Sequence, residues 1–140
     1  MNNGFLLHER LAAGSADIGC HGICRVLLKN QAHFPWLLLV PMVPPEITEL
    51  HHLSDAQYTA VTDSIRVFSH WMEHAMHAEK VNVAAIGNQV RQLHIHIVGR
   101  NSQDIAWPGV VWSRPEKIPY AEAEHERIKN LLRVVIDSQG

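Results

Sequence analysis

The hydrophobic and polar positions of the chain repeat with two periods, one typical of strands and one typical of helices. Apolar runs at residues 22–30 (GICRVLLKN) and 35–43 (PWLLLVPMV) stand on either side of a polar turn, which predicts an antiparallel hairpin. Residues 80–87 (KVNVAAIG) and 92–100 (QLHIHIVGR) predict two further strands, because β-branched residues recur in them and glycines bound the runs.

The segment between these two pairs of strands has the three- and four-residue spacing of an amphipathic helix. Ser54 or Asp55 can cap its first turn, and the helix is expected to continue to about Lys80. Its apolar stripe consists of Tyr58, Val61, Ile65, Phe68, Met72 and Met76. A helix with one apolar face needs a surface to pack against, and the predicted sheet provides one.

The two ends of the chain predict further helices. A short helix is expected over residues 5–13, and a longer one runs from Tyr120 to about Asp137 with the apolar stripe Ile128, Leu131, Leu132 and Val135. Pro and Gly residues between 104 and 119 predict a long loop. This order of elements is typical of an α+β domain, in which the long helix covers one face of an antiparallel sheet and leaves the other face for a site.

Length and charge exclude several classes of protein. A chain of 140 residues fits one domain, residues 1–140, and is long enough to bury a core without metals or disulfides. Its formal net charge of −2 gives no general positive field for nucleic acid or an anionic membrane. No apolar run is long enough for a signal peptide or a membrane span, so we expect a cytoplasmic protein.

The two cysteines, Cys20 and Cys24, do not have the spacing of a Cys-x-x-Cys motif. In a protein that is not secreted, reduced thiols are expected, and a small buried cysteine side chain is the common outcome. A zinc site that also uses His21 or His33 is the alternative.

Histidines on the long helix form a pattern that is typical of a metal site. Residues 70–74 (HWMEH) match the His-x-x-Glu-His pattern of inverted zinc peptidases, and His77 follows. At the helical repeat, His70, His74 and His77 lie roughly 170° from the apolar stripe. We therefore expect these side chains to face solvent and to bind metal only adventitiously, although a metal-binding protein that uses them is an alternative hypothesis.

The strongest chemical signal lies in the strand QLHIHIV. In an extended strand Gln92, His94 and His96 share one face, and the aliphatic residues share the other. A neutral His94 can attack an electrophile, and a protonated His96 beside it can stabilise an oxyanion. The turn from Gly87 to Gln89 can bind phosphate oxygens through its backbone N–H groups, which indicates phosphorus as the electrophile.

The stretch NVAAIGNQVRQLHIHIVGR resembles the signature of the histidine-triad (HIT) family of nucleotide hydrolases and transferases. The segment PWLLLVPMVPPEITELHHLSD is similar to the second strand of that family and to the start of its long helix, and DIAWPGVVW resembles a segment of a bacterial subset. The resemblance implies a HIT-like fold with an antiparallel sheet of about five strands, a long helix and a C-terminal helix.

The resemblance also implies roles for individual residues. The covalent nucleophile of the family falls on His94, and the histidine that contacts the scissile phosphate falls on His96. The implied substrate-binding residues are Asn82, Gly87, Asn88, Gln89 and Gln92.

The chain departs from the family pattern at three positions. Gln92 stands in place of the first triad histidine, and Trp36 and Pro44 stand where further histidines are common. Glutamine can donate and accept hydrogen bonds but carries no proton charge. A weaker or differently tuned enzyme is therefore expected.

The predicted function is hydrolysis at the α-phosphorus of a nucleoside phosphoester, a phosphoanhydride of the dinucleoside polyphosphate type, or a phosphoramidate, through a nucleotidyl-histidine. No metal or other cofactor is required by this scheme. The alternatives are a nucleotidyltransferase and a nucleotide-binding module with weak or no turnover. Arg91 and Arg100 flank the strand, either as a source of positive potential or as solvated rim charges.

The resemblance further implies a homodimer. Trp71, Trp107 and Trp112 are large aromatic residues at the edge of the helix stripe and in the loop after the motif. Such residues mark an interface, a wall of the ligand site, or ordinary packing over the sheet.

Overall fold

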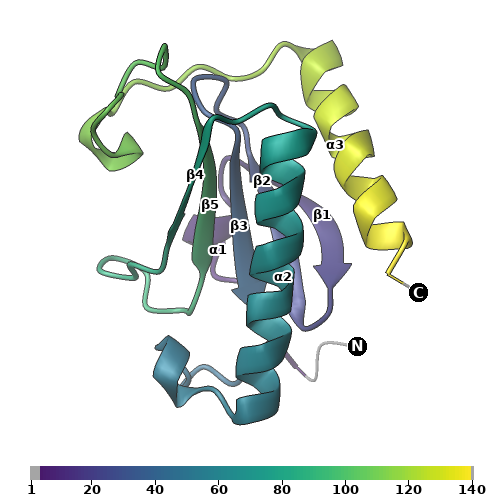
Figure 1. Cartoon of the computed structure of the whole chain (residues 1–140). Helices are drawn as coiled ribbons and strands as arrows, with labels where there is room; N and C mark the ends of the chain where they lie inside the picture. Colours follow the sequence, from purple (N-terminus) through teal and green to yellow (C-terminus); the bar gives the residue numbers. More distant parts are fainter. Residues whose placement is uncertain (1–3, 140) are drawn as a thin grey trace.

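This computed structural model describes residues 4–139 of the chain. Within that range, five strands form one antiparallel sheet in the order β1-β2-β3-β5-β4 (Figure 1). The strands are β1 (Ser15–His21), β2 (Cys24–Lys29), β3 (Trp36–Pro41), β4 (Lys80–Ala84) and β5 (Ile95–Arg100). The expected α+β architecture with about five strands is confirmed.

The predicted hairpin is formed by β2 and β3, in which Leu27 pairs with Leu38. β3 is buried and apolar on both faces, and β2 is so over Val26 to Leu28, as expected for the centre of a covered sheet. The adjoining strand β1 has no such pattern in its sequence SADIGCH, and the hydrophobic periodicity did not predict it. It is an edge strand with a register shift between Asp17 and Gly19, and it is held by pairing with β2 and by packing of the C-terminal helix.

The long helix α2 covers Asp55–His74. Its start is fixed by a capping box, in which the Ser54 hydroxyl accepts from the Gln57 N–H and the Gln57 side chain accepts from the Ser54 N–H. The prediction that the helix continues to Lys80 is wrong. The chain reverses at His77, whose φ of 59° is left-handed, and Ala78 N–H donates to the carbonyl of Met72.

The remaining helices lie near the two ends of the chain. The C-terminal helix α3 (Glu122–Asp137) has the predicted extent, whereas α1 (Glu9–Ala12) is much shorter than the expected helix over residues 5–13. Two short 3₁₀ helices, η1 (Leu50–His52) and η2 (Val111–Ser113), interrupt the loops.

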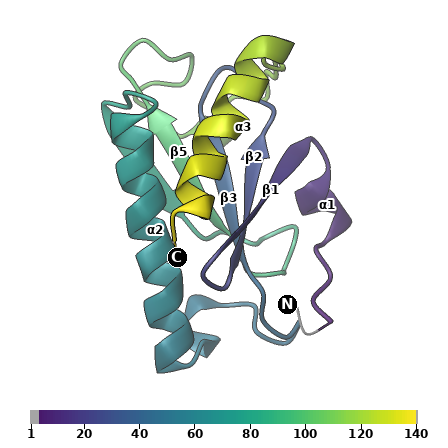
Figure 2. The ribbon, with the colours of Figure 1, turned by 90° about the vertical axis from the view of Figure 1, so that its right-hand side faces the viewer.

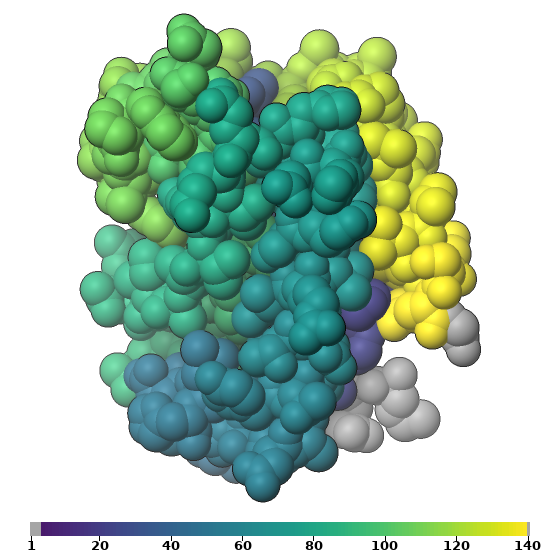
Figure 3. All heavy atoms as spheres, viewed as in Figure 1, coloured from purple at the N-terminus to yellow at the C-terminus, as the bar shows by residue number. Residues whose placement is uncertain are grey.

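Two apolar clusters lie on opposite faces of the sheet. Helices α2 and α3 cover one face (Figures 1 and 3), where Phe68, Met72, Ile128 and Leu132 are fully buried against the strands. Each such side chain contributes about 1.5–3 kcal/mol by burial. Figure 2 shows α1 on the side of the sheet away from α2, where a smaller cluster forms around Leu11, Phe34 and Val111. The second face is thus only partly covered.

Trp71 belongs to the larger cluster and is 6% exposed, so within this chain its role is ordinary packing. No helix within residues 4–139 combines the length and the apolar character needed to cross a bilayer.

Candidate active site

His94 and His96 lie together on the partly covered face of the sheet. They are 6% and 7% exposed, and their ring centroids are 4.9 Å apart. Strand β5 begins at Ile95, so His96 is in the strand and His94 directly precedes it. The pairing of His96 with Leu38 of β3 anchors the second histidine in the middle of the sheet.

The tautomer of His94 is fixed by a backbone group. His94 Nδ1 lies 2.7 Å from the carbonyl oxygen of Gln92. A carbonyl only accepts hydrogen bonds, so Nδ1 must carry the hydrogen. The neutral ring therefore has its lone pair on Nε2.

His96 has the opposite tautomer. The indole Nε1–H of Trp36 donates to His96 Nδ1 at 3.0 Å, and an indole can only donate. His96 Nδ1 is thus unprotonated, and Nε2 carries the hydrogen. Burial, the neighbouring His94 and the Lys29 ammonium together lower the pKa of His96 to about 3. The expectation of a protonated His96 is therefore wrong for the unliganded protein, because a second proton would be buried and would break the bond from Trp36.

Two tryptophan rings fix the position of His96. Trp112 lies edge-on to His96 with ring centroids 5.0 Å apart, and edge-on to Trp36 at 5.5 Å. Trp36 in turn lies at 5.8 Å from His96. Trp112 therefore forms a wall next to the histidine of its own chain, which is one of the expected roles of the tryptophans.

A cavity of about 470 Å³ opens beside the two histidines, and its size is within the range of small-molecule sites. The turn from Gly87 to Gln89 lines it, and Gly87 has the positive φ of 67° that this turn requires. Trp112 lines it as well. The structure thus brings together five residues that sequence reasoning selected, namely His94, His96, Gly87, Asn88 and Gln89.

Comparison with known proteins identifies the family. The family model of the HIT domain matches residues 15–103. The chain belongs to the HIT domain family. Members of this family generally bind nucleotides and act as hydrolases or transferases.

Solved structures of similar proteins cover nearly the whole HIT chain. A histidine triad protein from Marinobacter aquaeolei VT8 is 38% identical, covers 97% of this chain and 98% of its own length, and has a TM-score of 0.90. One from Bradyrhizobium japonicum is 35% identical over 94% and 98% of the two chains, also with a TM-score of 0.90. One from Sinorhizobium meliloti 1021 is 35% identical over 94% and 97%, with a TM-score of 0.88. No functionally curated protein matches the sequence.

Gln92 does not line this cavity of the HIT protein, but it lines a small neighbouring pocket together with Gly87 and His94. Its amide nitrogen donates to the carbonyl of Leu6 at 2.9 Å, and its amide oxygen accepts from the N–H of His8 at 2.8 Å. The Gln92 side chain thus holds the N-terminal segment. His8 has an extended backbone and caps the first helix, which starts only at Glu9.

Asn82 also lies outside the cavity. Its side-chain oxygen accepts from Arg100 Nη1 at 2.9 Å, and Arg100 forms an ion pair with Asp104 at 2.8 Å. Arg100 is 3% exposed and lies 5.7 Å from the ring of Trp107, so it is not a solvated rim charge. The cluster around Arg100 ties the loop after the motif to the sheet. Arg91, by contrast, is exposed and does not line the cavity.

The cavity is also lined by three cations that sequence reasoning did not select, namely Arg10, Lys29 and Lys117. They come from α1, from the end of β2 and from the loop before α3, so no local motif links them. Only the fold brings these residues to the two histidines.

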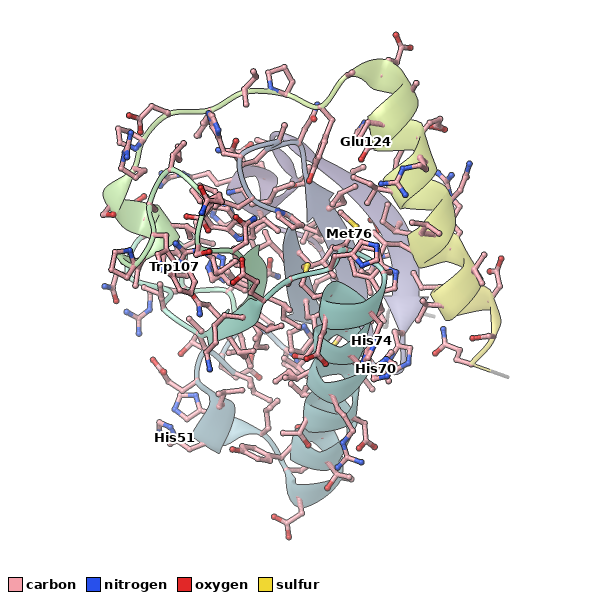
Figure 4. All side chains as sticks on the ribbon, turned by 45° about the horizontal axis from the view of Figure 1, so that its top comes forward. His51, His70, His74, Met76, Trp107 and Glu124 are labelled. Carbon is pink, nitrogen blue, oxygen red and sulfur yellow. The ribbon has the colours of Figure 1, made fainter. Side chains whose placement is uncertain are left out.

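The histidines of the long helix are a separate feature. His70 and His74 lie side by side on α2 (Figure 4), with ring centroids 4.1 Å apart, and both are exposed, as is His77. Within residues 4–139 no group of three His, Cys, Asp or Glu side chains is arranged to hold a metal ion. Cys24 is buried, which raises the pKa of its thiol to about 12, and the Sγ of Cys20 lies 3.0 Å from Arg25 Nη1.

Proposed function

We propose that this HIT protein is a nucleotide hydrolase in which His94 is the nucleophile. The observation that carries the proposal is the bond between His94 Nδ1 and the Gln92 carbonyl, because it leaves the lone pair of a buried, cavity-lining imidazole on Nε2. An unprotonated imidazole nitrogen is the form that attacks phosphorus.

In the first step His94 Nε2 attacks the α-phosphorus of a nucleoside phosphoester, phosphoanhydride or phosphoramidate. The N–P bond forms, and the bond from phosphorus to the leaving group breaks with its electron pair on the leaving group, which takes a proton from solvent where it departs as an amine or alcohol. The imidazole ring becomes positively charged in the nucleotidyl-histidine. The carbonyl of Gln92, which accepts from Nδ1 at 2.7 Å, stabilises that charge.

In the second step water attacks the same phosphorus. The N–P bond breaks, its electron pair returns to Nε2, and the proton of the water passes to solvent. The products are a nucleoside monophosphate and the free histidine. When another nucleophile replaces water, the same intermediate gives a transferase.

His96 acts in this scheme as a neutral hydrogen-bond donor. Its Nε2–H is directed by the bond from Trp36 to Nδ1 and is available to a non-bridging phosphate oxygen. The N–H groups of the turn from Gly87 to Gln89 provide further donors in the same cavity. Neutral donors stabilise the developing charge without a proton transfer.

A turnover screen over adenylyl and guanylyl phosphoramidates, dinucleoside polyphosphates and phosphoesters tests the proposal. We expect hydrolysis by the wild type and, in rapid-quench samples, a nucleotide attached to His94 that mass spectrometry locates. His94→Ala should show neither. Tight nucleotide binding without turnover or labelling would instead indicate a binding module.

A further inference from the structure

The charged side chains that line the cavity are all positive. Lys29 and Lys117 both line it, and no Asp or Glu is among the described residues that form its wall. None of the ion pairs within residues 4–139 involves either lysine. Two ammonium groups that share a cavity repel one another unless an anion lies between them.

The position of Lys29 is fixed by aromatic and electrostatic contacts. Its ammonium lies 4.6 Å from the ring centroid of Trp36, the residue that donates to His96. Burial and the nearby Lys117 lower the pKa of Lys29. The same ammonium helps to lower the pKa of His96, so it lies next to the second histidine.

Lys117 is exposed, but the backbone on either side of it is held by a buried amide. Gln31 is 6% exposed, its Nε2 donates to the carbonyl of Glu116 at 3.0 Å, and its Oε1 accepts from the N–H of Ile118 at 3.4 Å. The carbonyl of Ile118 accepts from Ala32 N–H at 2.7 Å. The backbone on both sides of Lys117 is therefore fixed to the end of β2, close to Lys29.

Arg10 reaches the cavity in a comparable way. Gln92 holds Leu6 and His8, and Arg10 Nη2 donates to the side-chain oxygen of Gln89 at 3.1 Å. Arg10 is thus bound to the turn from Gly87 to Gln89, where the attacked phosphate would bind.

We propose that Lys29 and Lys117 form a second anion subsite, which binds a phosphate group of the substrate other than the one attacked by His94. This subsite rests on the proposed function for its place beside the attacked phosphate. The ligand class is a nucleotide with two phosphates, in which the second is linked either to the first or to the ribose.

Isothermal titration calorimetry of the purified protein tests the subsite without any turnover. The probes are AMP, α,β-methylene-ADP and adenosine 3′,5′-bisphosphate, so that the two positions of the second phosphate are compared directly. Because the second phosphate would contact both ammonium groups, at least one of the doubly phosphorylated probes should bind about tenfold tighter than AMP, a difference of about 1.4 kcal/mol.

Variants assign that difference to the two lysines. In Lys29→Gln and in Lys117→Gln the preference for the second phosphate should shrink to about threefold or less. Lys129→Gln, on α3 and on the other face of the sheet, should keep the wild-type preference. Arg10→Gln should weaken all probes by a similar factor, because Arg10 contacts the turn and not the lysine pair.

The proposal is overturned if AMP binds as tightly as both doubly phosphorylated probes, or if the preference survives both lysine substitutions. Its outcome is independent of the proposed chemistry. A preference for the second phosphate without His94-dependent turnover would support the subsite and refute the hydrolase. Turnover without that preference would support the hydrolase and refute the subsite.

Discussion

Two pairs of histidines in this protein have similar spacing and very different surroundings. The rings of His70 and His74 are 4.1 Å apart, and those of His94 and His96 are 4.9 Å apart. The first pair is exposed on a helix, whereas the second is buried, lines a cavity and has a separate hydrogen-bond partner for each ring. Proximity of imidazoles does not make a site; fixed tautomers and a cavity do.

The largest expected effect separates the two pairs directly. His94→Ala should lower turnover on the order of a thousandfold or more, because the nucleophile is removed, while the matched variant His74→Ala should keep wild-type kcat/KM. Circular dichroism and a cooperative thermal transition check that both variants fold. Equal activity of His94→Ala and wild type would refute the proposed mechanism.

The burial of His96 predicts a dependence of stability on pH. Its pKa is lowered from 6.5 to about 3 in the folded protein, so the unfolded chain binds the proton more readily. The contribution of neutral His96 to the free energy of unfolding is fully present above pH 6.5 and is lost as the pH falls toward 3. Between pH 7 and pH 5 the free energy of unfolding should drop by about 1–2 kcal/mol through His96.

Urea unfolding at both pH values measures that drop. His96→Asn should reduce the difference between the two pH values, and His70→Asn on the exposed face of α2 serves as the comparison. If wild type and His96→Asn lose the same free energy, His96 is not the group responsible.

The hydrogen bond from Trp36 to His96 is a contact that the exposed pair, His70 and His74, lacks within residues 4–139. Trp36→Phe keeps an aromatic ring and removes the donor, so His96 Nδ1 becomes free to bind a proton. We expect the pKa of His96 to rise and turnover to fall by about tenfold, which is the typical size of one lost hydrogen bond to a reacting group. NMR titration of the imidazole and the pH–rate profile measure the two effects. An unchanged His96 pKa would show that the indole does not control the tautomer.

A smaller effect is expected at Gln92. Gln92→Ala removes the bonds to Leu6 and His8, so Arg10 is less well placed against the turn and KM should rise about threefold to tenfold with little change in kcat. Gln92→His, which places an ionisable side chain at this position, is the matched variant. A KM unchanged in both would mean that the N-terminal segment has no part in binding.

The smallest effect concerns metal at the exposed pair. Imidazoles at positions i and i+4 of a helix are neighbours and can chelate Ni²⁺ or Zn²⁺ weakly. His74→Ala should abolish that binding in a calorimetric titration and leave turnover unchanged. A loss of turnover after removal of metal from the wild type would give this pair a functional role that its exposure does not indicate.

Periodicity predicted the elements that form the centre of the fold and failed at their edges. Apolar runs identified β2, β3 and β5, and helical spacing identified α2 and α3. Strand β1 was missed because its stability comes from neighbours and not from its own pattern. The end of α2 was missed because it depends on a left-handed backbone at His77, a residue type that gives only a weak signal for it.

For the site, local sequence predicted what lies within one strand and one turn. It selected His94, His96 and the turn from Gly87 to Gln89, which line one cavity in the structure. It could not predict that the Gln92 side chain turns to the N-terminal segment or that Asn82 binds Arg100. Both contacts depend on partners far away in the sequence. The homodimer depends on a second copy of the chain and stays a prediction.

The match to the family covers residues 15–103 and therefore stops short of Arg10, Trp112 and Lys117, which all line the cavity. On the functions proposed here, the shared domain encodes the reaction, and the two flanks encode much of the choice of ligand. Substitutions at Arg10, Trp112 or Lys117 are then expected to change which nucleotide is preferred without altering the segment that carries His94 and His96.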